Sequence, residues 1–316
     1  MKLQGVPRRL VLHFECAIED SVRAFANGLE RQARVLDAGA GECQYAHWFS
    51  GQRYTAIDLA VGDSAWNYSG LDAICDLTAI SLADGCFDAA INIVTLEHVR
   101  EPARALREIA RTLRPGAPLL LVVPFEWEVH QEPQDYFRFT RYGLDYLLRR
   151  AGFAHREIRP VGGYFRLLSR RLYSGIQFFM SGWRWVGFPI VALALAPLAL
   201  AAPLLDGLDK KKAFTLGYIC IARRGLTDDL GSPRSPSDVA SSLEEQAQVQ
   251  PPGTAERLVP PTKGAAPVRS CASEGHAQGG SRPRLRSGEF MEGMPARDSA
   301  LCASGDAKRL GESRAD

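Results

Sequence analysis

The sequence has little excess charge and no cysteine or histidine pattern of the kinds that mark common metal sites. Its 316 residues include 38 Lys and Arg against 36 Asp and Glu, a formal net charge of +2. No overall field therefore draws the chain to DNA, RNA or anionic lipid. The seven scattered cysteines form no C-x-x-C pair, which argues against a zinc knuckle and a disulfide framework. Because no H-E-x-x-H spacing occurs either, the sequence predicts no metal site.

A signal-peptide pattern is also missing from the first twenty residues. Their apolar run is interrupted by His13, Glu15, Glu19 and Asp20. Together with the unpaired cysteines, this predicts a protein on the cytoplasmic, reducing side of a membrane. Hydrophobic residues make up 46% of the chain, enough to bury a sizeable core.

Composition divides the chain into four parts. Residues 1–160 alternate short apolar runs with amphipathic ones, as expected for a folded core, and residues 161–213 form an apolar, aromatic insertion. Residues 214–224 are predicted to be the closing strand of the core. Residues 225–316 are rich in Ser, Pro, Gly and Arg and poor in aliphatics, so we predict a disordered, dispensable tail, with a binding tail as the alternative.

Strand and helix patterns alternate through the core. The predicted strands are 34–38, 54–58, 73–76, 87–94, 119–123, 153–159 and 214–223. The predicted helices are 10–25, one beginning at 45–49, 101–113 and 141–151. This order predicts an α/β fold, a parallel sheet with right-handed crossovers and helices on both faces.

The first predicted strand ends in a glycine-rich turn. In open α/β sheets ligands bind at the carboxyl ends of the strands. Gly39 and Gly41 allow a tight turn and leave no side chain between backbone and ligand. A dinucleotide fingerprint would need Gly or Ala where Gln44 stands. The negative charge of Asp37 would repel a pyrophosphate, but it would attract the cationic group of an amino acid.

Acidic residues end the next two strands as well. Asp58, followed by Leu59, suits a ribose diol, because its carboxylate accepts two hydrogen bonds. Asp76 can accept from an exocyclic amine, and Leu77 can pack on a purine. A ligand with both a nucleoside and an amino-acid end is S-adenosylmethionine, which is the predicted cofactor. Taken singly, each residue could also serve an ordinary turn or helix cap.

Five segments in this order resemble the motifs of class I SAM-dependent methyltransferases. They are residues 35–41, 54–58, 76–77, 87–99 and 113–117. The group they resemble is the small-molecule type 11 group, which includes quinone, sterol and glycan methylating enzymes. The resemblance covers residues 34–152 and, more weakly, the closing strand. It implies a Rossmann-like sheet of seven strands, the last of them inserted antiparallel beside the fifth.

The resemblance also implies roles for individual residues. The methionine end would be held by Asp37, Gly39 and Gly41, the ribose by Asp58, the adenine by Asp76 and Leu77, and the cofactor floor would be formed by Asn92 and Ile93. The chain departs from the pattern at Cys43, where many relatives have a third glycine, which puts only local packing in doubt.

Two histidines are candidate bases on the acceptor side. His98 follows the fourth predicted strand, and ordering of a loop is its alternative role. His130 lies in an aromatic loop and titrates near neutral pH, which suits a general base that Asp135 would orient. The alternative is that this loop merely covers the sheet.

The insertion contains an uncharged run over residues 188–205, long enough to span a membrane. A single crossing would separate two strands of one sheet, and the sequence predicts that Pro189, Pro197 and Pro203 break a straight helix. We therefore expect a monotopic contact through residues 166–205, with a lid or a dimer interface as alternatives. The basic and Trp residues that favour a headgroup contact are Arg166, Arg170, Arg171, Trp183, Arg184, Trp185 and the lysines at 210–212.

These observations predict an enzyme: a SAM-dependent methyltransferase at the cytoplasmic face of a membrane. The expected acceptor is a small or lipid-linked molecule of the glycan or quinone type. In-line transfer to oxygen is favoured because a histidine base is at hand. A catalytically silent SAM-binding or membrane-associated scaffold is the alternative.

Overall fold

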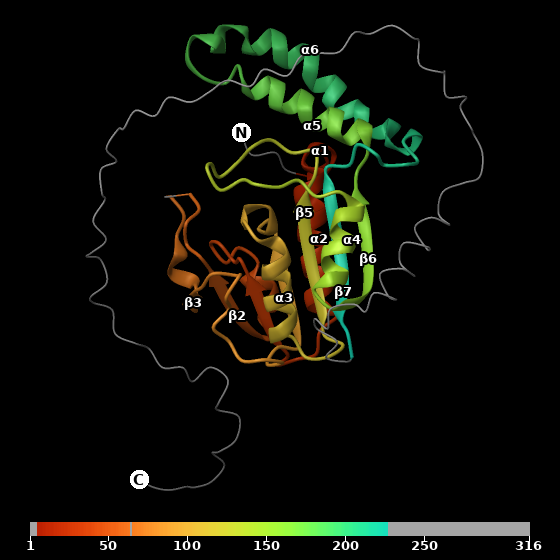
Figure 1. Cartoon of the computed structure of the whole chain (residues 1–316). Helices are drawn as coiled ribbons and strands as arrows, with labels where there is room; N and C mark the ends of the chain where they lie inside the picture. Colours follow the sequence, from red (N-terminus) through yellow and green to blue (C-terminus); the bar gives the residue numbers. More distant parts are fainter. Residues whose placement is uncertain (1–4, 64, 227–316) are drawn as a thin grey trace, which may run out of the picture. The chain divides into compact units, whose positions relative to one another are not determined.

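One seven-stranded sheet organises the protein (Figure 1). The computed structural model describes residues 5–63 and 65–226, so the predicted tail lies outside the described residues from 227 onward. The sheet order is β3-β2-β1-β4-β5-β7-β6. The strands are β1 Arg34–Ala38, β2 Arg53–Asp58, β3 Ala73–Ile74, β4 Ala89–Ile93, β5 Pro118–Pro124, β6 Phe153–Val161 and β7 Gly217–Arg224. β7 pairs antiparallel with both β5 and β6, which confirms the predicted insertion of the last strand.

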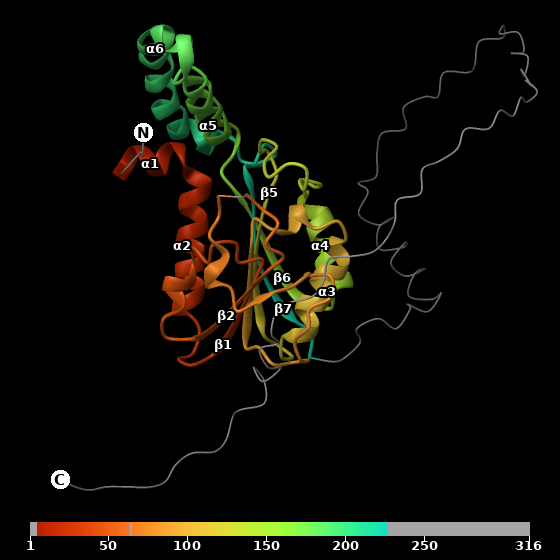
Figure 2. The ribbon, with the colours of Figure 1, turned by 90° about the vertical axis from the view of Figure 1, so that its left-hand side faces the viewer.

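Helices cover both faces of the sheet (Figure 2). α2 (His13–Asn27) lies against one face, and α3 (Pro102–Thr112) and α4 (Arg141–Arg150) lie against the other. Proline at the first turn begins α3, and the Thr140 hydroxyl caps α4 by accepting from the Gly143 amide. β4 and most of β5 are buried. Their side chains point alternately to the two faces of the sheet, and a hydrophobic core covers each face.

The connection between β1 and β2 differs from the prediction. The helix expected from Tyr45 is only the short 3₁₀ helix η1 (Ala46–Phe49). Gly41 and Cys43 both have positive φ, so helical backbone begins only after Cys43 and makes a single short turn. The predicted opening helix is also divided, with α1 (Gly5–Val11) separated from α2 at Leu12.

The insertion forms a helical hairpin between β6 and β7. It consists of α5 (Tyr164–Gln177), η4 (Gly182–Gly187), α6 (Phe188–Ala201) and η5 (Ala202–Leu208). Val161 pairs with Gly217, so the chain leaves and re-enters the sheet at adjacent positions. This confirms that the strands on both sides of the insertion belong to one sheet. The division of core and insertion at residue 160 stays a prediction.

Helix α6 continues through a proline that was expected to break it. Pro189 lies in the first turn of α6 and Pro203 in that of η5, where a missing N–H costs little. Pro197 lies inside α6, so the prediction is wrong at this position. Packing of α6 against α5 offsets the one lost backbone hydrogen bond. The continuous helical segment Gly182–Leu208 contains an 18-residue stretch with a mean hydropathy of 2.2. Only 17% of that stretch is buried inside the protein, and the segment is long and apolar enough to cross a membrane.

Candidate cofactor and acceptor site

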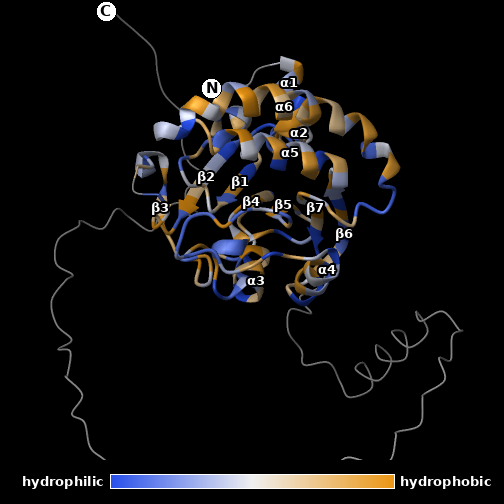
Figure 3. Ribbon diagram, turned by 90° about the horizontal axis from the view of Figure 1, so that it is seen from above, coloured by the Kyte–Doolittle hydropathy of each residue, from blue (hydrophilic) through white to orange (hydrophobic). Residues whose placement is uncertain are grey.

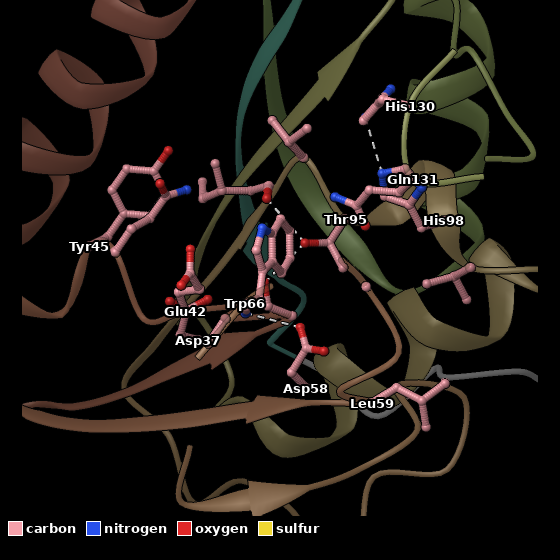
Figure 4. A pocket seen from close by; sticks show the side chains of 18 of the residues that line it. Asp37, Glu42, Tyr45, Asp58, Leu59, Trp66, Thr95, His98, His130 and Gln131 are labelled. Atoms are coloured by element: carbon pink, nitrogen blue, oxygen red, sulfur yellow. Dashed lines mark hydrogen bonds between the residues drawn. The ribbon is translucent and has the colours of Figure 1, made fainter. Parts of the chain in front are cut away.

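A cavity of about 1110 Å³ opens at the carboxyl ends of the parallel strands (Figure 4). The predicted residues that line it are Asp37, Gly39, Gly41, Asp58, Leu59, Asp76, Leu77, Ile93, His98 and His130. Small-molecule pockets typically measure roughly 300–1,000 Å³, so this cavity has room for a cofactor and an acceptor together.

The glycine turn after β1 tolerates no side chain at its centre. Gly39 has φ +92°, and a Cβ atom there would lie 2.2 Å from Cγ2 of Thr95. Gly41 has φ +53°, and its Cβ would lie 3.2 Å from the Trp66 ring. Positive φ at both glycines agrees with the predicted tight turn, and the groups that a Cβ atom would meet are side chains of the protein itself.

Asp37 is a buried carboxylate on the cavity wall. It accepts a short hydrogen bond from the Tyr54 hydroxyl. Burial raises the pKa of Asp37 to about 7, although the hydrogen bond from Tyr54 opposes the shift. A buried acid with this pKa is stabilised by a cationic partner, which fits the ammonium group of an amino-acid ligand.

Two further carboxylates end neighbouring strands. Asp58 accepts from the backbone amides of Gly41 at 3.0 Å and Ala60 at 2.8 Å, which fixes the turns on either side of the cavity floor. Asp76 accepts from the amide and hydroxyl of Thr78 through one oxygen, at 2.8 and 2.9 Å. Carboxylate oxygens on both residues keep lone pairs for a nucleoside.

Asn92 does not line the cavity, in contrast to the prediction. Its side chain is fully buried and donates to the Ala38 carbonyl at 2.6 Å, so it ties β4 to β1. Its neighbour Ile93 does line the cavity. Successive side chains of a strand point to opposite faces, so only one of the two can form the floor.

His98 and His130 meet at the acceptor side of the cavity. Their Nε2 atoms lie 3.1 Å apart, as the dashed line in Figure 4 marks. Glu97, fully buried behind them, places Oε1 3.7 Å from both Nε2 atoms. The Glu97 carboxylate raises the pKa of His130. His98 Nδ1 also contacts the Gln134 carbonyl at 2.7 Å, so His98 orders the loop as well as facing the cavity.

Asp135 acts behind the cavity wall rather than in it. It accepts from the His130 backbone amide at 2.9 Å, and its carboxylate lies 3.5 Å from the ring Nδ1. Arg138 donates to both carboxylate oxygens at 2.6 and 2.7 Å and holds the pKa of Asp135 down to about 2. Asp135 is therefore a positioning residue for the loop that carries His130.

Several residues of the site were not assigned roles from the sequence. Glu97 had a signal, because it directly precedes His98. Trp66 lies over the glycine turn and Trp127 forms another part of the wall, but both stand in loops without a periodic pattern. Tyr54 partners Asp37 from the neighbouring strand, which only strand register reveals.

The strand order, the glycine turn and the acidic strand ends define a Rossmann-like nucleotide-binding enzyme domain. Residues 36–121 match the family model described as a methyltransferase domain. This match assigns residues 36–121 to a methyltransferase domain, and S-adenosylmethionine is the cofactor that such a domain uses.

One curated protein and several solved structures are similar to the chain. An uncharacterised 37.1 kDa protein in transposon Tn4556 of Streptomyces fradiae is 31% identical over 108 residues. That match covers 29% of this chain and about a third of the relative, 31% of its length.

Among solved structures, the [4+2]-cyclase SpnF is 23% identical, covering 67% of this chain and 81% of that one, with a TM-score of 0.43. The 1,6-didemethyltoxoflavin-N1-methyltransferase of Burkholderia thailandensis is 21% identical, covering 66% and 79%, with a TM-score of 0.42. A putative sarcosine dimethylglycine methyltransferase of Galdieria sulphuraria is 16% identical, covering 67% and 84%, with a TM-score of 0.42.

Proposed function

We propose that this methyltransferase works at the cytoplasmic face of a membrane on an amphiphilic acceptor, a lipid-linked glycan or a polyprenylated quinone. The observation that carries the proposal is the position of the exposed apolar hairpin. β6 runs antiparallel to β7, which runs antiparallel to β5, so β6 ends at the same sheet edge as β5. The hairpin therefore begins at the edge where the cavity opens (Figure 1).

The hairpin exposes a large apolar surface. Seen from above, hydrophobic residues colour much of α6 (Figure 3). The exposed large side chains here are Tyr164, Phe178, Met180, Trp183, Trp185, Val186, Ile190, Leu193, Leu198, Leu200, Leu204, Leu205 and Leu208. An exposed apolar surface of this kind marks an interaction site, and Trp residues near the start of α6 suit the level of lipid headgroups.

Most of the arginines expected at the headgroups have partners inside the protein. Arg166 pairs with Asp206 at 3.4 Å, and Arg171 pairs with Glu128 at 3.2 Å. Arg170 donates to Glu15. Arg184, Lys210 and Lys211 are the exposed basic residues that remain among those predicted. The contact we propose is therefore mainly apolar and only weakly sensitive to salt.

Helix α5 connects the hairpin to the cavity wall. Arg170 of α5 donates to Glu15 at 2.6 Å and lies over the Trp127 ring, 4.6 Å from its centroid. Glu15 and Trp127 both line the cavity. An acceptor held by a lipid tail at the hairpin would thus present its polar head to the site.

The residues of the cavity divide the chemistry between them. When bound, S-adenosylmethionine supplies a methyl group on a cationic sulfur, and the carbon–sulfur bond breaks as the acceptor oxygen bonds the carbon. Asp37 and Asp58 would hold the amino-acid and ribose ends. The histidine cluster would favour release of the acceptor hydroxyl proton, which is the reason for proposing methylation on oxygen.

Flotation with phosphatidylcholine vesicles tests the membrane part of the proposal. Ile190→Asp combined with Leu193→Asp should weaken vesicle binding at least tenfold, because each buried apolar side chain contributes about 1.5–3 kcal/mol. Tyr142→Asp, at an exposed aromatic of α4, is the matched control and should float as the wild type does. Equal flotation of the double variant and the wild type, or none by either, would contradict the proposal.

A methylation assay tests the chemical part. Membrane lipid extract incubated with labelled S-adenosylmethionine should yield a labelled, base-stable ether. Label on nitrogen or carbon would overturn the oxygen assignment. Normal cofactor binding without any labelled lipid would favour the scaffold alternative.

A further inference from the structure

Two imidazoles and a buried carboxylate converge beside the cavity. Glu97 and His98 lie on η3 (Leu96–His98), which begins shortly after β4, and His130 lies on the loop between β5 and α4. Within the described part of the chain, neither oxygen of the buried Glu97 carboxylate has a hydrogen-bond partner. An unpaired buried carboxylate is costly, so a cation is the partner that this pocket requires.

The tautomers of the two histidines sharpen this requirement. His98 Nδ1 faces the Gln134 carbonyl at 2.7 Å, and His130 Nδ1 faces the Glu128 carbonyl at 3.1 Å. Carbonyl oxygens only accept hydrogen bonds, so both Nδ1 atoms carry their proton. In the neutral rings both Nε2 atoms then present lone pairs to each other at 3.1 Å. This arrangement repels unless a proton or a metal ion lies between the rings.

The spacing of the three ligand atoms fits a single metal ion. Bonds of about 2.0–2.2 Å in a tetrahedral site put ligand atoms about 3.4 Å apart. Here the two Nε2 atoms are 3.1 Å apart, and Glu97 Oε1 is 3.7 Å from each. Imidazoles that bind metals usually donate their other ring N–H to a carbonyl or carboxylate, as both histidines do here.

We propose that Glu97, His98 and His130 bind one divalent transition-metal ion, with Zn²⁺ as the natural probe. Glu97 lies behind the wall and both histidines line the cavity, so the open coordination position faces the acceptor side. The sequence predicts no metal site, because His130 stands 32 residues after His98 and only the fold brings them together. The site is distinct from the carboxylates assigned to the cofactor.

The metal ion would activate the acceptor for methyl transfer, and this role rests on the proposed function. An acceptor hydroxyl at the open position would release its proton to solvent, and its oxygen would remain on the metal as the nucleophile. The two imidazoles would then hold the ion rather than the proton. Metal binding itself needs neither cofactor nor acceptor, so it stands or falls separately from the proposed function.

The test is titration of the chelator-stripped full-length protein with Zn²⁺ against a chromophoric competitor. We expect His130→Ala and Glu97→Gln each to lose one binding site, and His155→Ala, at an exposed histidine of β6, to keep it. Cysteines could bind Zn²⁺ elsewhere, so the titration is repeated with Co²⁺. Visible absorption of a four-coordinate nitrogen and oxygen site, without thiolate charge transfer, is the expected signature.

His130→Ala is the variant least prone to misfold, because His130 stands on a loop. Circular dichroism and S-adenosylhomocysteine affinity check that this variant is folded. Absence of a site in the wild type would overturn the proposal, as would a site that survives in His130→Ala. Nitrogen NMR showing a protonated imidazole pair in the presence of excess Zn²⁺ would also overturn it, in favour of a shared proton.

Discussion

Asp58 accepts hydrogen bonds from two backbone amides, so its carboxylate positions both turns beside the predicted ribose site. Asp58→Ala should weaken S-adenosylhomocysteine binding by about 1–3 kcal/mol, through lost charged hydrogen bonds and a loosened turn. Asp58→Asn keeps an acceptor oxygen and should lose less. Calorimetric titration measures both affinities, and an unchanged value for Asp58→Ala would contradict the ribose assignment.

The raised pKa of Asp37 makes cofactor affinity depend on pH. Burial, with Asp58 nearby, raises this pKa to about 7, and the Tyr54 hydroxyl opposes the shift. Below pH 7 the carboxyl is protonated and loses its attraction for the cofactor's ammonium group. Affinity for S-adenosylhomocysteine should therefore be about tenfold weaker at pH 6 than at pH 8.

Asp37→Asn is the control for that titration. The variant should bind weakly and show a flat profile between the two pH values, because no carboxyl remains to titrate. The same slope in Asp37→Asn as in the wild type would assign the pH dependence to another group.

The sequence predicted which residues at the strand ends line the cavity better than it predicted which loop residues contact one another. Gly39, Gly41 and Asp58 follow strands, and the carboxyl ends of parallel strands meet at one edge, so their meeting could be predicted from chain order. The contact of His98 with His130 depends on how a loop folds back, which no periodicity encodes. Asn92 was misplaced because the resemblance names a segment and not the face that each side chain takes.

At the scale of elements, Arg170 joins α5 to the core. Its guanidinium binds Glu15 of α2 and covers Trp127, and the pair is largely buried. Arg170→Ala should lower the free energy of unfolding by about 2–3 kcal/mol, because Glu15 would be left without its partner. Arg184→Ala, at an exposed arginine of the same hairpin, should change it by less than about 0.5 kcal/mol. Urea denaturation measures the free energy of unfolding of both variants. Equal losses in the two would show that Arg170 does not stabilise the packing of α5 on the core.

Element boundaries departed from the sequence prediction where local patterns competed with available length. η1 begins late and is short because Gly41 and Cys43 have positive φ, which interrupts the helical backbone that the apolar pattern predicts. α6 continues through Pro197 because tertiary packing outweighs one lost hydrogen bond, which propensity alone does not anticipate. The strongly periodic α3 and α4, in contrast, match their predicted ranges closely.

At the scale of the whole molecule, β7 holds the sheet together. It pairs along its length with β5 and β6, so a chain ending at residue 216 would leave both with open edges. That chain should lose S-adenosylhomocysteine binding, although it keeps every predicted cofactor residue. A chain ending at residue 226 should bind as the full-length protein does. Binding by the shorter chain would show that the cavity forms without β7.

The sheet order was predictable only through the family resemblance, because apolar runs identify strands and not their neighbours. The position of the hairpin at the cavity edge follows from the pairing of Val161 with Gly217, two residues that lie far apart in the chain. Length and hydropathy alone predicted an apolar segment without indicating what it adjoins.

The place of β7 has a consequence for synthesis on the ribosome. The strand that lies between β5 and β6 is translated after both, so the sheet stays incomplete until residue 224 has emerged. The apolar hairpin of residues 164–208 is translated before β7. On the proposed membrane role, the segment that contacts lipid is therefore synthesised before the strand that completes the catalytic domain.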